Sequence, residues 1–391
     1  LGDSYKGIPF FGIDDNLYYT AKIQDIIDGH WTVSSPFLFE YKSTYPLVLP
    51  IGEFFYVILS GLFFLSVANA VLLAKFLFPA ILFFLIYWLV LKLINKNILS
   101  WPGKINSIMG GLLVVLGFDL VDYKNTWLFL SGQSHQFFLS IWTRPVNPVT
   151  GAMLLFIFLL LIWRIIDYRG IRPKFMFLPA GLILGSMIYY FFSWGTAMSV
   201  LGVLIVIFFI KKECEIFKQL FYAALASFLV LLPYWCGLWF FVGGKNWQKM
   251  SRQNGMFYTH QPMPNKVLLV GLLIFLPCLI YEFYKKNQTG QKIENWWWLC
   301  LSFLLGGLLA LNQQILTGRT IWPYHFVQYT VPLVMVVLVV LFYNFIKSRL
   351  PKIWRLGTAA VFIFLSVFAF ATIRNFSSRG DDRVGDMEKL Q

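Results

Sequence analysis

The chain has 391 residues, of which 58% are hydrophobic, 19% aromatic and only 13% charged. Soluble globular domains carry charge on about a quarter of their residues, so this composition excludes an ordinary water-soluble protein. The formal net charge of +14 does not indicate nucleic-acid binding, because the basic residues lie in short breaks between long apolar blocks. Helices satisfy their own backbone hydrogen bonds in lipid, and we therefore predict an all-α, polytopic integral membrane protein.

The N-terminal region, residues 1–69, is predicted to lie outside the lipid and to contain amphipathic helices. A helix is expected just after Asp14 and Asp15, from the apolar spacing of "LYYTAKIQDII". Residues 50–65 are apolar but short and contain Glu53, so we predict a helix in the membrane interface rather than a span. The sequence begins in polar residues, and we expect a further N-terminal span to precede them.

The body of the chain, residues 70–374, is predicted to cross the bilayer about ten times, because its apolar segments are as long as a bilayer crossing requires. The predicted spans are residues 70–91, 105–121, 148–166, 175–192, 195–210, 219–240, 266–284, 296–314, 329–346 and 356–374. Residues 375–391 are expected to form a polar C-terminal tail on the same side as residues 1–69.

The distribution of charge predicts the orientation in the membrane. About half of the 32 Lys and Arg residues fall in five short loops on one side of the predicted bundle, and most of the 18 acids fall on the other side. Lys and Arg in short loops resist translocation, so the basic side is predicted to be cytoplasmic. The basic loops are too short to build a site, and we expect the functional site on the exterior, periplasmic side of a plasma (inner) membrane.

The stretch "GIDDNLYYTAKIQDIIDGHW" places two adjacent acids at the head of the first predicted helix. Either Asp14 or Asp15 could cap the helix by accepting hydrogen bonds from its first N–H groups. A cap accounts for one acid but not for the pair, nor for the "DGHW" and "STYPLVLPIGE" that follow.

This order of residues resembles the first exterior loop of the GT-C superfamily of membrane glycosyltransferases, which includes dolichyl-phosphate-mannose-protein mannosyltransferases and aminoarabinose transferases. In that family an acidic pair is followed by a tyrosine, an alanine, a helix ending in Gly-(Asp/His)-Trp and a proline-leucine segment. The corresponding residues here are Asp14, Asp15, Tyr18 or Tyr19, Ala21, Gly29, His30, Trp31, Tyr45, Pro46 and Leu47. The resemblance covers about the first fifty residues in motif, and the rest of the chain only as topology.

The resemblance implies an inverting-type transferase that moves a sugar from a polyprenyl-phosphate donor to a glycan, lipid or protein acceptor at the outer membrane surface. It also implies that Asp14 or Asp15 deprotonates or orients the acceptor hydroxyl, and we favour Asp15. A carboxylate near the low-dielectric interface has a raised pKa, which suits it to base catalysis.

The second exterior loop adds three candidates. Asp119 and Asp122 are either solvated loop acids or they position the acceptor, alone or through a divalent cation held with the first acidic pair. Oxygen ligands of this kind suit Mg²⁺ or Mn²⁺, although some members of the family need no metal. Arg144, which lies between Trp142 and Pro145, is either an interfacial anchor or a contact to the donor phosphate.

The late exterior loop, "LNQQILTGRTIWPYHF", contains the remaining candidates. The planar guanidinium of Arg319 suits bidentate binding of phosphate, and the resemblance implies that a cation in this loop binds the donor phosphate. His325 either assists the phosphate or leaving group, or is a packed, hydrogen-bonded structural residue.

Two other functions are compatible with a polytopic chain of this kind. A transporter or flippase of lipid-linked glycans would show ionisable residues deep within spans or inverted repeats, and no acid lies in the middle of a predicted span. An O-antigen polymerase or ligase would share the lipid-linked donor but would use arginines of the later loops instead of an early acidic pair.

Overall fold

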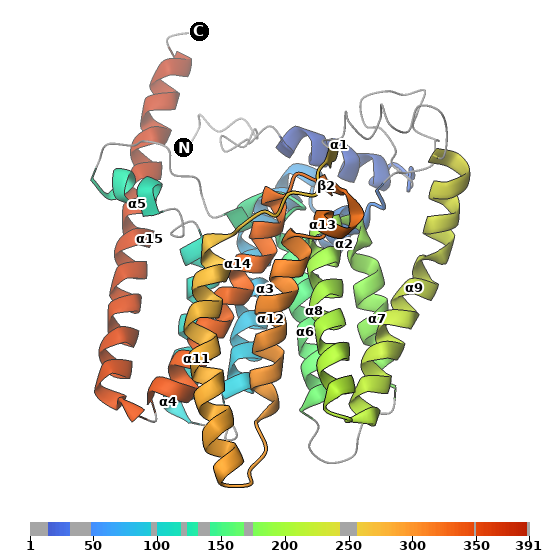
Figure 1. Cartoon of the computed structure of the whole chain (residues 1–391). Helices are drawn as coiled ribbons and strands as arrows, with labels where there is room; N and C mark the ends of the chain where they lie inside the picture. The colour runs from blue at the N-terminus through green and yellow to red at the C-terminus, as the bar shows by residue number, and fades with distance from the viewer. Residues whose placement is uncertain are drawn as a thin grey trace.

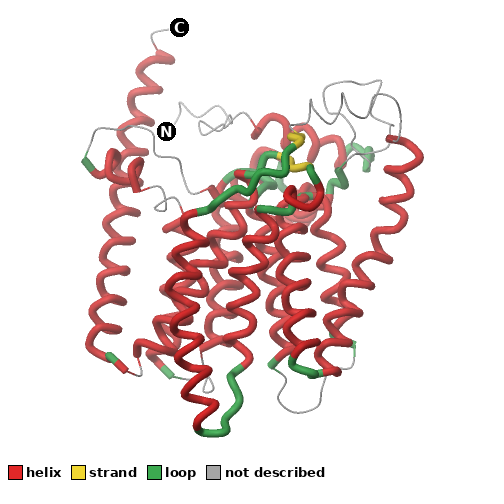
Figure 2. Tube along the Cα trace, viewed as in Figure 1, coloured by secondary structure: helices red, strands yellow, loops and turns green. Residues whose placement is uncertain are grey.

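The computed structural model describes residues 15–31, 48–94, 100–118, 123–131, 141–167, 175–242, 256–347 and 349–388. The described part is almost entirely helical, with two short strands at one end (Figure 2). The α-helices are α1 Asp15–Ile27, α2 Ile51–Phe63, α3 Val67–Ile94, α4 Trp101–Gly117, α5 Tyr123–Leu130, α6 Val149–Ile166, α7 Phe177–Ser186, α8 Phe191–Ile210, α9 Cys214–Val242, α11 Lys266–Gln288, α12 Asn295–Leu311, α13 Gln314–Thr317, α14 Tyr324–Leu341 and α15 Pro351–Glu388. Short 3₁₀ turns η4 (Ile141–Thr143) and η5 (Met187–Tyr189), a π-helix η6 (Phe342–Lys347) and strands β1 (Met256–Tyr258) and β2 (Arg319–Ile321) complete the described elements.

Eight of these helical stretches are long and apolar enough to cross a membrane, by length and composition. They correspond to α3, α6, α8, α9, α11, α12 with α13, α14 with η6, and the first part of α15. Large apolar side chains lie on their outer surfaces, for example Phe76 at 72% and Leu273 at 73% exposure. Because such surfaces are unfavourable in water, the helices are suited to lipid, and the prediction of an all-α polytopic membrane protein is supported.

Two of the ten predicted spans, 105–121 and 175–192, are not among the eight. The first corresponds to α4, whose 17 residues span only about 25 Å at 1.5 Å per residue. The second is interrupted, because α7 ends at Ser186 and passes through η5 before Tyr190 turns extended and α8 begins. The predicted interfacial segment 50–65 is confirmed as a short helix, α2, with Glu53 buried in it.

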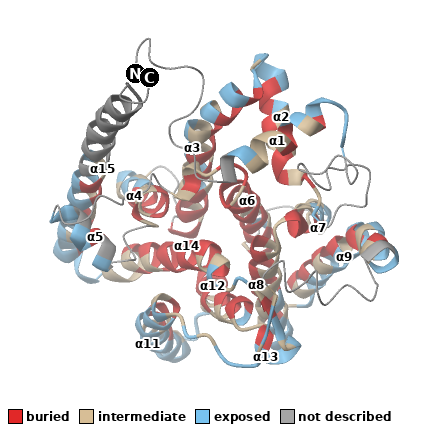
Figure 3. Ribbon diagram, turned by 90° about the horizontal axis from the view of Figure 1, so that it is seen from above, coloured by how far each residue is buried: buried red, intermediate tan, exposed pale blue. Residues whose placement is uncertain are grey.

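The helices pack as a bundle around α6 and α14 (Figure 3). In the span windows of α6 and α14, 78% and 72% of residues are buried, against 22% in α15. A helix that is apolar on all sides belongs in the interior of a bundle, which explains the central place of α6. The outer helix α15 contacts mainly α4 and η6 and runs as one helix to Glu388, through most of the predicted tail.

The two ends of the bundle differ in content (Figure 1). One, called here the α1 end, carries α1, α2, α13 and the antiparallel pair of β1 and β2. The other, called here the basic end, carries the C-termini of α3, α6, α8 and α11 and the N-terminus of α12. The predicted site residues that the structure describes all belong to the α1 end.

Candidate functional site

The acidic pair lies at the start of α1. Asp15 is the first residue of this helix, as the apolar spacing predicted, while Asp14 lies outside the described residues. Ile23 and Ile26, three residues apart on one face, are buried, so α1 is held by an apolar stripe against its neighbours α2 and α3. The start of α1 thereby lies at the same end of the bundle as the late loop (Figure 1).

A buried ion pair joins α1 to α2. The ammonium of Lys22 lies 3.1 Å from Oε1 of Glu53, and the two side chains are only 6% and 3% exposed. Burial is the largest single influence and lowers the pKa of Lys22, but the charge of Glu53, its hydrogen bond and the nearby Tyr18 and Tyr19 together raise the pKa above its ordinary value. An unpaired charge at this depth would cost several kcal/mol, so each residue of the pair depends on the other. A sign of the pair in the sequence is that Lys22 adjoins Ile23, one of the apolar residues of the predicted helix.

The turn that leads into α6 connects this pair to the rest of the α1 end. Val146 adopts a positive φ of 60°, which costs a β-branched residue about 1–3 kcal/mol. Its N–H donates to the hydroxyl of Tyr56 at 2.8 Å, and Asn147 donates to the hydroxyl of Tyr19 at 3.2 Å. Residues of α1 and α2 thus hold the turn 144–150 in place.

The contact of α2 with this turn requires a glycine. A Cβ on Gly52 would lie 2.6 Å from both the ring of Tyr189 and a methyl group of Val146. Tyr189 in turn shares a hydrogen bond of 2.6 Å with the hydroxyl of Thr150. The glycine next to Glu53 therefore lets α2 approach the start of α6 and η5 closely.

Arg144 lies in the same turn, directly after η4 and half buried. Trp142, two residues before it, is fully buried and its indole N–H donates to the carbonyl of Val114 at 2.9 Å. The tryptophan thus fixes the backbone beside Arg144. Contact of Arg144 with a donor phosphate stays a prediction.

His325 is hydrogen-bonded and stacked within an aromatic cluster. Its Nδ1 lies 2.7 Å from the hydroxyl of Tyr190, and its ring stacks on Phe192 with centroids 4.9 Å apart. The neighbouring Tyr329 donates to the carbonyl of Pro148 at 3.2 Å, which links this cluster to the turn 144–150. The geometry agrees with the packed structural histidine, and a role of His325 at the phosphate stays a prediction.

Arg319 lies on β2, which forms a short antiparallel two-stranded sheet with β1 that the sequence did not predict. β2 pairs with β1 so that Arg319 lies opposite Tyr258, and its guanidinium carbon is 5.7 Å from the centroid of the Tyr258 ring. The turn before it needs Gly318, whose φ is +68° and whose Cβ would lie 3.0 Å from the ring of His260. Arg319 itself is exposed, so its guanidinium is accessible to an anion.

Three polar residues just after the C-terminus of α12, Asn312, Gln313 and Gln314, hold β2 and the segment after β1 to the bundle. The side-chain oxygen of Asn312 accepts from the N–H of Met263 at 2.6 Å, and Gln314 donates to the carbonyl of Gln261 at 3.1 Å. Gln313 donates to the carbonyl of Arg319 at 2.8 Å. The three amides thus bond backbone groups of two loops that are far apart in sequence.

A pocket of about 410 Å³ lies between the start of α8 and the sheet of β1 and β2. Its walls are mostly apolar, with Trp194, Met198 and Phe326 among them, and Arg319 also lines it. An apolar hollow bordered by an exposed guanidinium can hold an amphipathic molecule with a hydrocarbon part and an anionic head.

The predicted metal site falls largely outside the described residues, because Asp14, Asp119 and Asp122 are not among them. Within the described ranges no three His, Cys, Asp or Glu side chains are grouped as metal ligands. The choice between Mg²⁺, Mn²⁺ and a metal-free mechanism therefore stays a prediction.

Comparison of the chain with protein-family models, curated protein sequences and solved structures found no match. The functional reading consequently depends on the residues at the α1 end and on the motif at the start of α1.

Proposed function

We propose that the chain is a membrane glycosyltransferase of the GT-C type, which moves a sugar from a polyprenyl-phosphate donor to an acceptor at the exterior face of the membrane. The observation that carries the proposal is the joint presence, at one end of the bundle, of the acidic start of α1 and of an exposed arginine beside an apolar pocket. A lipid-linked sugar phosphate is an amphipathic molecule of the kind that such a pocket accepts.

The reaction follows from the chemistry of these groups. The acceptor hydroxyl attacks the anomeric carbon while the carboxylate of Asp15, or of Asp14, takes its proton. The bond between the anomeric carbon and the phosphate oxygen breaks, and the configuration at that carbon is inverted. Polyprenyl phosphate leaves with the electron pair, and its charge is stabilised by the guanidinium of Arg319.

The other candidate residues act around this step. Arg144, in the turn that α1 and α2 hold, is a second cation for the donor phosphate. His325 can share a proton with the leaving phosphate, or it can fix the start of α14 through Tyr190. Asp119 and Asp122 position the acceptor or complete a site for Mg²⁺ or Mn²⁺.

The test is a transfer assay on the full-length protein in liposomes with polyprenyl-phosphate sugars and a panel of acceptors. Asp15→Asn, or Asp14→Asn if that residue is the base, should abolish turnover with the protein still folded. Asp28→Asn at the other end of α1 is the matched control, because its side chain is exposed and an amide oxygen still accepts from Gln24.

Arg319→Ala should chiefly weaken donor binding, by roughly ten- to a hundredfold in KM, because one charge-assisted contact is worth about 1.5–3 kcal/mol. Lys266→Ala, another exposed cation at the α1 end, should leave KM unchanged. Full activity in both Asp variants would refute the proposed chemistry. Movement of the lipid-linked sugar across the bilayer without transfer would instead favour the transporter.

A further inference from the structure

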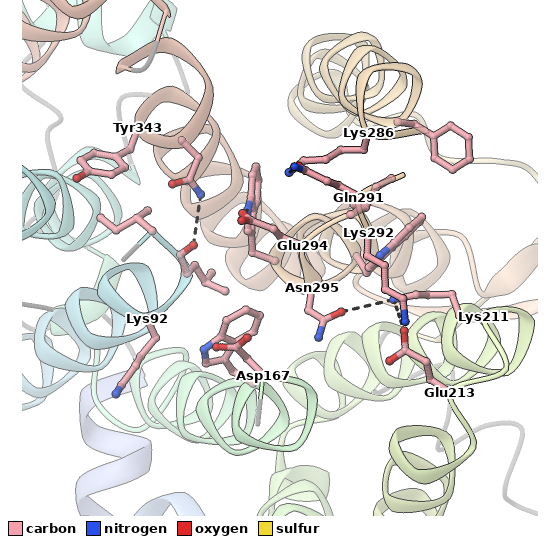
Figure 4. Close-up of a pocket in the computed structure, with 18 of the residues that line it drawn as sticks. Lys92, Asp167, Lys211, Glu213, Lys286, Gln291, Lys292, Glu294, Asn295 and Tyr343 are labelled. Atoms are coloured by element: carbon pink, nitrogen blue, oxygen red, sulfur yellow. Dashed lines mark hydrogen bonds and ion pairs between the residues drawn. The ribbon is translucent and has the colours of Figure 1, made fainter. Parts of the chain in front are cut away.

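A large hollow of the described structure lies at the basic end, far from the proposed donor site. It has a volume of about 1340 Å³ and is lined by residues from the ends of α3, α6, α8, α11, α12 and η6. The basic loops alone were expected to be too short to build a site, and the walls of this hollow come mainly from helix ends, together with residues 291–294 between α11 and α12. We call this hollow the basic-end pocket (Figure 4).

Two asparagines build the walls by bonding the last carbonyls of distant helices. Asn295 donates to the carbonyl of Ile166 at the end of α6, at 3.0 Å. Asn344 donates to the carbonyl of Leu93 at the end of α3, at 3.3 Å. Since free carbonyls at helix ends need partners, these contacts fix the relative positions of four helix ends around the pocket.

Five lysines line the pocket, and within the described part of the chain only Lys211 among them forms an ion pair with a carboxylate. Lys286 donates to the amide oxygen of Gln291 at 2.9 Å, and Lys347 donates to the hydroxyl of Tyr343 at 2.8 Å. Neither forms an ion pair with any described acid. Lys211, in contrast, is paired with Glu213 at 2.8 Å. The pocket therefore has cations whose present partners are neutral.

The acids in the pocket lining are fewer than the lysines. Glu294 accepts a hydrogen bond from the indole of Trp296 at 2.9 Å, and Asp167 lies at the end of α6. Five lysines line the pocket against three acids. The balance is positive.

Two further groups offer hydrogen-bond donors inside the pocket. The N-terminus of helix α12, whose N-cap residue Glu294 makes no side-chain cap, also lines the pocket and places the positive end of the helix dipole there. The indole N–H of Trp298, which also lines the pocket, is buried without an acceptor among the described residues. Buried donors normally have partners, and an anion in the pocket would supply one.

We propose that the basic-end pocket binds a phosphate-bearing anion, with Lys286 and Lys347 as its principal cationic contacts. Ammonium groups bind phosphate as point charges, and basic pockets between membrane helices bind phospholipid headgroups. The lining also includes Trp163, Trp296 and Trp298, and tryptophan is a residue type enriched at the headgroup level of membrane proteins. The phosphate belongs either to an anionic phospholipid headgroup or to a soluble phosphate, and the pocket is large enough for both.

The experiment has two arms, both on the purified full-length chain. In the first, inorganic pyrophosphate is titrated by calorimetry into protein in phosphatidylcholine nanodiscs. In the second, bound phosphatidylglycerol is counted by native mass spectrometry and compared with phosphatidylcholine. Binding in the first arm identifies a soluble phosphate, and binding in the second alone identifies a headgroup.

Matched variants assign the binding to the pocket. Lys286→Gln should weaken binding about tenfold, as expected for one charge-assisted contact, and Lys286→Gln with Lys347→Gln about a hundredfold. Lys286→Arg keeps the charge and should retain most of the binding. Lys285→Gln, its exposed neighbour outside the pocket lining, should change nothing. The proposal is overturned if neither anion binds, or if Lys286→Gln and Lys285→Gln behave alike.

Discussion

Lys22 and Lys286 lie at opposite ends of the bundle and illustrate two ways in which a lysine is accommodated in an apolar protein. Lys22 is buried and paired with Glu53, within a region where tyrosine hydroxyls, backbone groups and amides bond one another. Lys286 is half buried and, among the described residues, donates to the neutral amide oxygen of Gln291 and forms no ion pair. A charged group that is removed from water needs an opposite charge beside it. The half-buried ammonium of Lys286 keeps contact with water and does not need one. The comparison separates structural charges from those available to ligands.

The largest expected effect comes from breaking the buried pair. Lys22→Met should lower the free energy of unfolding by about 3–5 kcal/mol, because Glu53 is left buried and uncompensated. The double variant Lys22→Met with Glu53→Met should recover most of this loss. Reversible unfolding in detergent, followed by tryptophan fluorescence, measures both. A loss below about 1 kcal/mol in the single variant would mean that the pair is not buried as described.

A smaller effect is expected where the two sides of the α1 end meet. Tyr56→Phe removes the acceptor of the Val146 N–H and should cost about 1–3 kcal/mol, because a buried donor is left without a partner. Tyr284→Phe, at an exposed site on α11, is the control and should be near neutral. Equal stability of the two variants would show that Tyr56 does not hold the turn 144–150.

The buried pair also predicts a dependence on pH. Since the pKa of Lys22 is raised above its ordinary value of 10.5, its contribution is complete below that pH and is lost as the pH rises through the folded-state value. The loss should not exceed about 1.4 kcal/mol per pH unit. The free energy of unfolding, measured at increasing alkaline pH, should show this decline in the wild type but not in Lys22→Met. The same decline in the variant would exclude Lys22 as its source.

The smallest effect on stability is expected at Arg319, the exposed cation of β2. Arg319→Ala should change the free energy of unfolding by no more than about 0.5 kcal/mol, as is usual for surface sites, while it weakens donor binding. A thermal-shift measurement alongside the transfer assay separates the two. A large loss of stability would class Arg319 with Lys22 as a structural charge.

Much of the fold could be predicted from the periodicity of apolar residues. The helix α1, which begins at Asp15 within one residue of the predicted start, and the short helix α2 follow from local pattern alone, whereas the burial of Glu53 was not predicted. The two missing spans show the limit of this reasoning. Average hydropathy does not reveal that Tyr190 turns the chain extended between α7 and α8, or that α4 stops after 17 residues.

The site was harder to predict, because its geometry depends on contacts between distant segments. Strands of three residues have no detectable periodicity, so the pairing of β1 with β2 could not be predicted from the sequence. Asn312 and Gln314 lie at the end of the predicted span 296–314, and only the structure pairs them with the backbone of residues 261–263. The basic-end pocket likewise depends on Asn295 and Asn344, whose partners lie on helices far away in sequence.

The most direct test of the proposed site is a cryo-electron-microscopy structure of the full-length protein in nanodiscs with a non-hydrolysable polyprenyl-phosphate sugar analogue. Our account predicts phosphate density against the Arg319 guanidinium, the prenyl chain in the pocket beside Trp194 and Phe326, and the anomeric carbon facing the acidic start of α1. Donor density elsewhere, with Arg319 exposed to solvent and the acids remote from the sugar, would contradict it.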